Sequence, residues 1–264
     1  MRKHMSYIQT DQRIHYLSQI LAKAGRTFIP KKEDDSHTNL YFNAEKNWIE
    51  GRWIETSNGN IKLVLRITDF CMLWVDEKEE TIHTVSSVKK LEQEVISQLS
   101  KIPHQYGLDT ASFSDPMHFE IPDYSFKGFE YQMINRHNLD EWMQWRSLGN
   151  KACERVLGML KVDGDIRIWP HHFDTGIFVQ TKERMGIGFG LAMQDIKVES
   201  PYFYMSGYPA IGSLVYENLP EIEKAEWITS GEYKGVVLPV TDFEETSTEL
   251  DKYIEKALGW FLKH

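Results

Sequence analysis

Hydrophobic positions at helical spacing predict four main helices. Apolar residues recur three or four positions apart in the ranges 11–24, 87–101, 138–160 and 247–262, which is the spacing of one buried helix face. Gly25 and Pro103 are placed to end the first two helices, and Asn138 with Glu141 resembles a capping box opening the third. We therefore expect each half of the chain to begin and end with a helix.

Short and alternating apolar runs between these helices predict antiparallel strands. In the first half the runs cover 40–42, 48–56, 61–67 and 70–75, and in the second half 166–169, 173–180, 186–191, 202–206 and 235–239. Ser57-Asn58-Gly59-Asn60 contains the Asn-Gly pair typical of a tight hairpin. Ile61, Leu63 and Leu65 alternate with more polar positions, as in a strand with one mostly buried face.

The order helix, strands, helix thus occurs twice and indicates an α+β fold. We expect two similar halves, each an antiparallel sheet flanked by helices, at residues 1–103 and 134–264. The range 104–133 would connect them, packed on the surface because it is rich in aromatic residues. An internal duplication and independent convergence on one layout both explain the repetition. The halves either stay separate or form one compact domain, and a duplication would favour a ligand cleft on the pseudo-two-fold axis.

Composition narrows the expected partners. The net charge is −9 and no basic patch is visible, so nucleic acid is not expected. No apolar stretch approaches the roughly 18 residues of a membrane span, and the N-terminus lacks the pattern of a signal peptide. Cys71 and Cys153 lie far apart and outside any CxxC spacing, which disfavours a disulfide framework or zinc knuckle. We expect a cytoplasmic protein without membrane contact, whose two cysteines lie in the core.

The segment Ile168-Trp169-Pro170-His171-His172-Phe173-Asp174 concentrates the most chemistry. In an extended strand His172 and Asp174 would share one face. Three interpretations stay open. The pair satisfies backbone groups at the start of the strand, or His172 acts as a base or ligand contact oriented by Asp174, or the two supply half of a metal site. The sequence does not identify the third metal ligand; His118, His137 and Glu199 qualify on chemistry alone.

Two further segments favour a polar sheet face. Glycines alternate in Met185-Gly186-Ile187-Gly188-Phe189-Gly190, a pattern that suits glycines making room for an aromatic or a packed helix better than a phosphate-binding loop. In Ser200–Pro209, Tyr202 and Tyr204 fall on one face of the predicted strand. Their hydroxyls either line a polar pocket or reach water at the edge of the core.

Three ordered motifs in the second half carry a resemblance. Trp169-Pro170-His171-His172-Phe173-Asp174, then Pro201-Tyr202-Phe203-Tyr204, then Gly235-Val236-Val237-Leu238-Pro239 resemble the W-P-x-H-F-D, P-Y-x-Y and G-x-V-L-P segments of an uncharacterised bacterial domain-of-unknown-function family. The likeness covers roughly residues 138–262. It implies a soluble bacterial protein and no assigned activity, cofactor or substrate.

The expected function is therefore binding of a small molecule, or interaction without catalysis, with no cofactor indicated. The expected pocket lies near six residues: Trp169, His171, His172, Asp174, Tyr202 and Tyr204. A hydrolase-type enzyme, with or without metal, is the alternative, in which His172 and Asp174 carry the chemistry although no G-x-S-x-G elbow is present. A third hypothesis is a structural subunit of a homo-oligomer.

Overall fold

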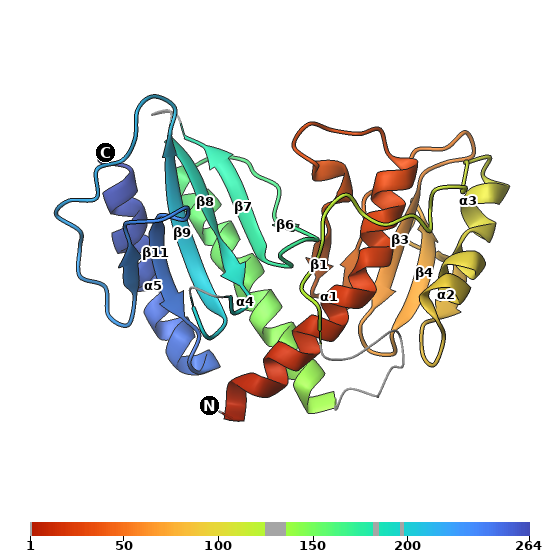
Figure 1. Cartoon of the computed structure of the whole chain (residues 1–264), viewed down its shortest axis with the longest axis horizontal. Helices are drawn as coiled ribbons and strands as arrows, with labels where there is room; N and C mark the ends of the chain where they lie inside the picture. Colours follow the sequence, from red (N-terminus) through yellow and green to blue (C-terminus); the bar gives the residue numbers. More distant parts are fainter. Residues whose placement is uncertain (1, 125–135, 182–184, 196–197) are drawn as a thin grey trace. The chain divides into compact units, whose positions relative to one another are not determined.

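A computed structural model describes residues 2–124, 136–181, 185–195 and 198–264 (Figure 1). The chain divides into an N-terminal unit, Gln9–Met143 with Ile168–Phe173, and a C-terminal unit, Met1–Ile8 with Gln144–Arg167 and Asp174–His264. Each unit holds one antiparallel sheet and its helices. The α+β class with two similar halves is confirmed. The duplication stays a prediction, and connector residues 125–133 lie outside the described ranges.

The N-terminal unit is an antiparallel meander with helices at its two ends. Its elements are α1 (Arg2–Phe28, from Gln9 onward), the 3₁₀ helix η1 (Ser36–Thr38), β1 (Tyr41–Asn43), β2 (Trp48–Glu50), β3 (Ile61–Arg66), β4 (Cys71–Asp76), β5 (Thr81–Ser86), α2 (Glu92–Leu99) and α3 (Lys101–Gln105). The strand order is β1-β2-β3-β4-β5. Gly59 takes a φ of 102°, and Ile54 bridges Ile61 across the turn. The predicted Asn-Gly hairpin is therefore confirmed.

Three predicted helix signals are wrong. Gly25 does not end a helix, because α1 continues to Phe28. Pro103 does not end a helix, because it lies in the first turn of α3, where the missing N–H group has no intrahelical partner to lose. Asn138 does not cap a helix, because α4 has already begun at Arg136. In each case a glycine, proline or polar residue lies inside a helix, where the sequence pattern placed it at an end.

Helices α1 and α2 cover one face of the N-terminal sheet. Trp74 lies opposite Leu63, contacts Phe28 of α1 at 6.4 Å between ring centroids, and donates its indole N–H to the Leu99 carbonyl of α2 at 2.9 Å. The opposite face is also dry, since Val64 and Leu73 are fully buried there. Strand β3 is thus buried on both faces, contrary to the single buried face that its alternation predicted.

A buried lysine explains part of that difference. Lys62 is only 4% exposed, and its ammonium donates to Glu50 Oε2 at 2.5 Å and to Glu79 Oε1 at 3.3 Å. The same nitrogen lies 4.4 Å from the ring centroid of Trp53. A polar residue was expected to face water at this position, but an ion pair and an indole ring cover it instead.

The C-terminal unit repeats the layout with a larger sheet. It holds α4 (Arg136–Leu160, from Gln144 onward), β6 (Arg167–Ile168, of which Arg167 belongs here), β7 (Thr175–Gln180), β8 (Met185–Ala192), β9 (Tyr202–Pro209), β10 (Glu226–Ile228), β11 (Gly235–Pro239) and α5 (Phe243–Phe261). The sheet order is β10-β11-β9-β8-β7-β6. Strand β10 was not predicted, because three residues with one tryptophan carry no clear alternation.

Helices α4 and α5 pack on the same face of this sheet (Figure 1). Gly149 of α4 lies against Leu191 and Thr175, and the Tyr253 hydroxyl of α5 donates to the Val236 carbonyl at 2.8 Å. Within the described ranges of this unit, no helix covers the opposite face, which carries Tyr204 and its cross-strand neighbours. We call it the open face.

The structure also bears on the remaining composition-based expectations. Among the described helices, none combines the length and apolar character needed to cross a membrane. Cys153 is buried as expected, whereas Cys71 is only half-buried.

Candidate functional site

The histidine segment forms a turn, so the predicted strand geometry is wrong. Pro170–His172 turns between β6 and β7, closed by a 2.7 Å hydrogen bond from the Phe173 N–H to the Trp169 carbonyl. Phe173 has a φ of 59°, in the left-handed region. His172 and Asp174 therefore do not share a strand face. His172 is exposed in the N-terminal unit, and Asp174 is buried in the C-terminal unit.

The turn is fixed to α1 by a buried histidine that the sequence analysis missed. The Nε2 atoms of His15 and Gln19 donate to the Pro170 carbonyl at 2.7 Å and 2.8 Å. Because Nε2 of His15 carries the proton, Nδ1 accepts the Tyr124 hydroxyl at 2.5 Å. The imidazole also stacks on Phe173, with 4.7 Å between centroids and 7° between planes. This part of the motif has a structural role.

The other predicted residues of the segment lie around the same turn. The rings of His171 and His172 are 4.2 Å apart, and the ring of Phe119 lies 5.7 Å from that of His171. Trp169 is half-buried. These contacts are ring packing within the N-terminal unit.

Asp174 forms a buried pair with Tyr204 in the C-terminal unit. The Tyr204 hydroxyl donates to Asp174 Oδ2 at 2.6 Å. Burial and the neighbouring carboxylate raise the pKa of Tyr204 well above the usual tyrosine value, so the phenol keeps its proton. Asp174 is 8% exposed, and its Oδ1 atom is buried without a hydrogen-bond partner among the described residues. Among the described residues, no lysine, arginine or histidine side chain pairs with Asp174.

A second tyrosine–carboxylate pair lies beside the first. The Tyr202 hydroxyl donates to Asp195 Oδ2 at 2.8 Å, and the rings of Tyr202 and Tyr204 are 6.5 Å apart. Burial, followed by the bond to Asp195, raises the pKa of Tyr202. We call Asp174, Asp195, Tyr202 and Tyr204 the tyrosine–aspartate cluster. Asp195 was missed because it lies between β8 and β9 in a stretch without a periodic signal.

Glycines on the open face make room for this cluster. Gly190 lies opposite both Gly176 and Tyr204. A Cβ atom added at Gly176 or Gly190 would lie 2.8 Å or 2.9 Å from the Tyr204 hydroxyl oxygen. The prediction that these glycines accommodate an aromatic is thus confirmed, and the glycine run lies inside strand β8 rather than at a helix N-terminus.

Two findings bear on the predicted metal site and on catalysis by a cysteine nucleophile. Among the described residues, no three His, Cys, Asp or Glu side chains gather in a group that could hold a metal ion. The pKa of the buried Cys153 thiol is raised, mainly by burial and then by Asp174, which opposes thiolate formation. The cluster therefore offers hydrogen-bond acceptors and aromatic faces.

Comparison of the chain with protein-family models, with curated proteins and with solved structures found no match in any of the three. The resemblance to the family with the W-P-x-H-F-D segment stays a prediction.

Proposed function

We propose that this protein binds a small organic amine at the tyrosine–aspartate cluster. The observation that carries the proposal is the Asp174 carboxylate, which is buried, has an unbonded oxygen and lacks a basic partner among the described residues. A buried carboxylate without a compensating partner is unfavourable by several kcal/mol, roughly. A ligand ammonium group would supply both the charge and the hydrogen bond that Oδ1 lacks.

The surroundings of Asp174 suit a cation better than an anion. Asp174 and Asp195 each accept a tyrosine hydroxyl, so both phenols act as donors to carboxylates, and Oδ1 of Asp174 is left as an acceptor. The neighbouring rings of Tyr202 and Tyr204 add π faces, which attract a cation within about 6 Å of a ring centroid.

A paired titration tests this function. Benzylamine and benzyl alcohol have the same ring and similar size, but only the amine carries a charge. Isothermal titration calorimetry of the full chain should show saturable binding of benzylamine and none of benzyl alcohol. Asp174→Asn should weaken benzylamine binding by at least about tenfold, because a hydrogen bond to a charged group is lost.

Stability measurements separate ligand binding from a structural role. Without ligand, Asp174→Asn should unfold at the same temperature or higher, since it removes an uncompensated buried charge and leaves an acceptor for Tyr204. Asp163→Asn, at an exposed carboxyl of the same unit, is the matched control and should change neither quantity. Absence of benzylamine binding, or binding that survives Asp174→Asn, would contradict the proposal.

A further inference from the structure

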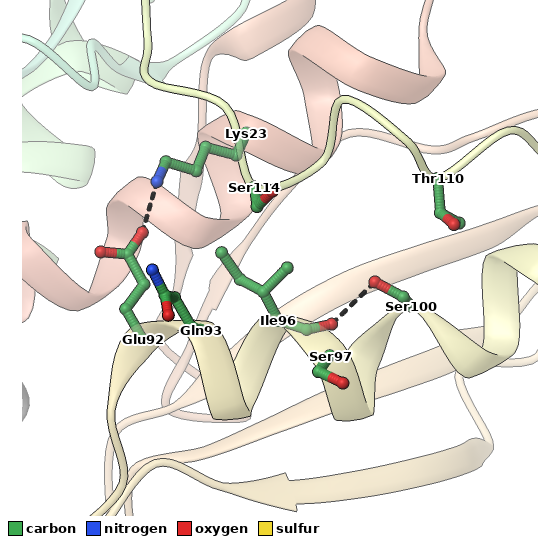
Figure 2. A pocket seen from close by; sticks show the side chains of 8 residues that line it. All are labelled: Lys23, Glu92, Gln93, Ile96, Ser97, Ser100, Thr110 and Ser114. Carbon is green, nitrogen blue, oxygen red and sulfur yellow. Dashed lines mark hydrogen bonds and ion pairs between the residues drawn. The ribbon is translucent and has the colours of Figure 1, made fainter.

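A pocket of roughly 440 Å³ opens in the N-terminal unit. It shares no residue with the tyrosine–aspartate cluster, which belongs to the C-terminal unit. Figure 2 shows it between α1, α2 and the segment that follows α3. Its lining residues are Lys23, Glu92, Gln93, Ile96, Ser97, Ser100, Thr110 and Ser114. Small-molecule sites commonly occupy about 300–1,000 Å³, so the volume suits a small ligand.

The wall that carries Thr110 and Ser114 is fixed by contacts of its own. Arg26 of α1 donates from Nη1 to the Asp115 and Pro116 carbonyls at 3.1 Å and 2.6 Å. Its Nη2 donates to the Ser112 carbonyl at 2.5 Å. Phe113 is fully buried, and its ring lies 5.1 Å from that of Phe28. The wall is therefore formed without a ligand, which lowers the entropy lost on binding.

The charges in the pocket cancel. Lys23 donates to Glu92 in an ion pair between α1 and α2, drawn as a dashed line in Figure 2. The two side chains are 12% and 28% exposed, so the pair is partly shielded from water. A ligand with a net charge would have to break this pair or leave its own charge uncompensated.

The remaining lining is rich in groups that both donate and accept hydrogen bonds. Ser97, Ser100, Thr110 and Ser114 contribute hydroxyls and Gln93 an amide. Ser100 donates to the Ile96 carbonyl at 2.8 Å, which leaves its oxygen as an acceptor. Ile96 supplies an apolar surface between these groups. We propose that this pocket binds a neutral, polyhydroxylated small molecule of the size of a monosaccharide or cyclic polyol.

Amide chemical shifts of the isotope-labelled full chain test the proposal. The probes are D-glucose, D-galactose, D-ribose and myo-inositol. Each is titrated to about 50 mM, because a site that offers only a few hydrogen bonds binds in roughly the millimolar range. At least one probe should give saturable shifts at Ser97, Thr110 and Ser114. Glucose 6-phosphate and gluconate, which carry a net negative charge, should bind more weakly than the best neutral probe.

Two serines of the same segment provide the matched pair. Both are exposed, but Ser114 lines the pocket, whereas Ser112 is not among its lining residues and its carbonyl accepts from Arg26 and from the Asp115 N–H. Ser114→Ala should weaken binding by about three- to tenfold, the range for one neutral hydrogen bond. Ser112→Ala should leave it unchanged. Absence of saturation with all four neutral probes, preference for a charged probe, or equal weakening by both variants would overturn the proposal.

Discussion

Replacing His15 with alanine is expected to destabilise the N-terminal unit strongly. The variant loses the bond from Nε2 to the Pro170 carbonyl, the bond from Tyr124 to Nδ1, and the stack on Phe173. Two buried hydrogen bonds at about 1 kcal/mol each, with an aromatic stack of about 1 kcal/mol, predict a loss of about 3 kcal/mol in the free energy of unfolding.

Urea unfolding followed by circular dichroism measures this loss, and amide hydrogen exchange at Phe173 localises it. The Phe173 N–H closes the turn at Trp169, so its protection reports on whether the turn stays fixed to α1. Gln19→Ala should cost only about 1 kcal/mol, because His15 still donates to the same carbonyl.

His104→Ala, at an exposed histidine of α3, is the control and should change the free energy of unfolding by less than about 0.5 kcal/mol. A loss below about 1 kcal/mol in His15→Ala, or an unchanged exchange rate at Phe173, would refute the reasoning that this imidazole holds the turn in place.

Three further predictions concern charge, packing and pH. Lys62→Ala should lower the free energy of unfolding by about 3 kcal/mol, because Glu50 stays buried without its cation; adding Glu50→Gln should recover most of the loss in the same urea assay. Gly190→Ala should lower the free energy of unfolding by about 1–3 kcal/mol, because the new Cβ would lie 2.3 Å from a backbone oxygen. Gly188→Ala meets nothing closer than 3.4 Å and should be tolerated, and thermal unfolding of the two variants tests this difference. Burial lowers the pKa of the His37 imidazole, so the unfolded chain takes up this proton first as the pH falls. The stability that His37 contributes is thus present above the unfolded pKa of about 6.5 and is lost below it. His37→Gln should therefore make the urea midpoint depend less on pH between about pH 7.5 and pH 5.

Local patterns predicted the layout of elements but not the geometry of the histidine segment. The helical spacing of Ile14, Leu17 and Leu21 and the Asn-Gly turn both depend on neighbouring residues, and both features are present. The turn at Pro170 depends instead on His15 and Gln19, 155 and 151 positions away, which no local periodicity can reveal.

The candidate sites divide in the same way. Tyr202, Tyr204 and the glycines opposite them follow a strand period of two, so their shared face could be predicted. Asp195 lies outside any strand. The pocket beside Lys23 is formed by segments that are distant in sequence. Its ion pair, Lys23 with Glu92, joins residues 69 positions apart, and no local spacing rule predicts such a contact.

The order in which the chain is synthesised differs from the order in which its units can be completed. Leu40 and Ile168 exchange two backbone hydrogen bonds, of 2.9 Å and 2.7 Å, and Ile168–Phe173 belongs to the unit that begins at Gln9. A nascent chain released only as far as Met143 lacks this segment, and the carbonyl that receives His15 and Gln19 has not yet been made. The N-terminal unit therefore finishes folding only after the ribosome has also delivered helix α4 and the start of the second sheet.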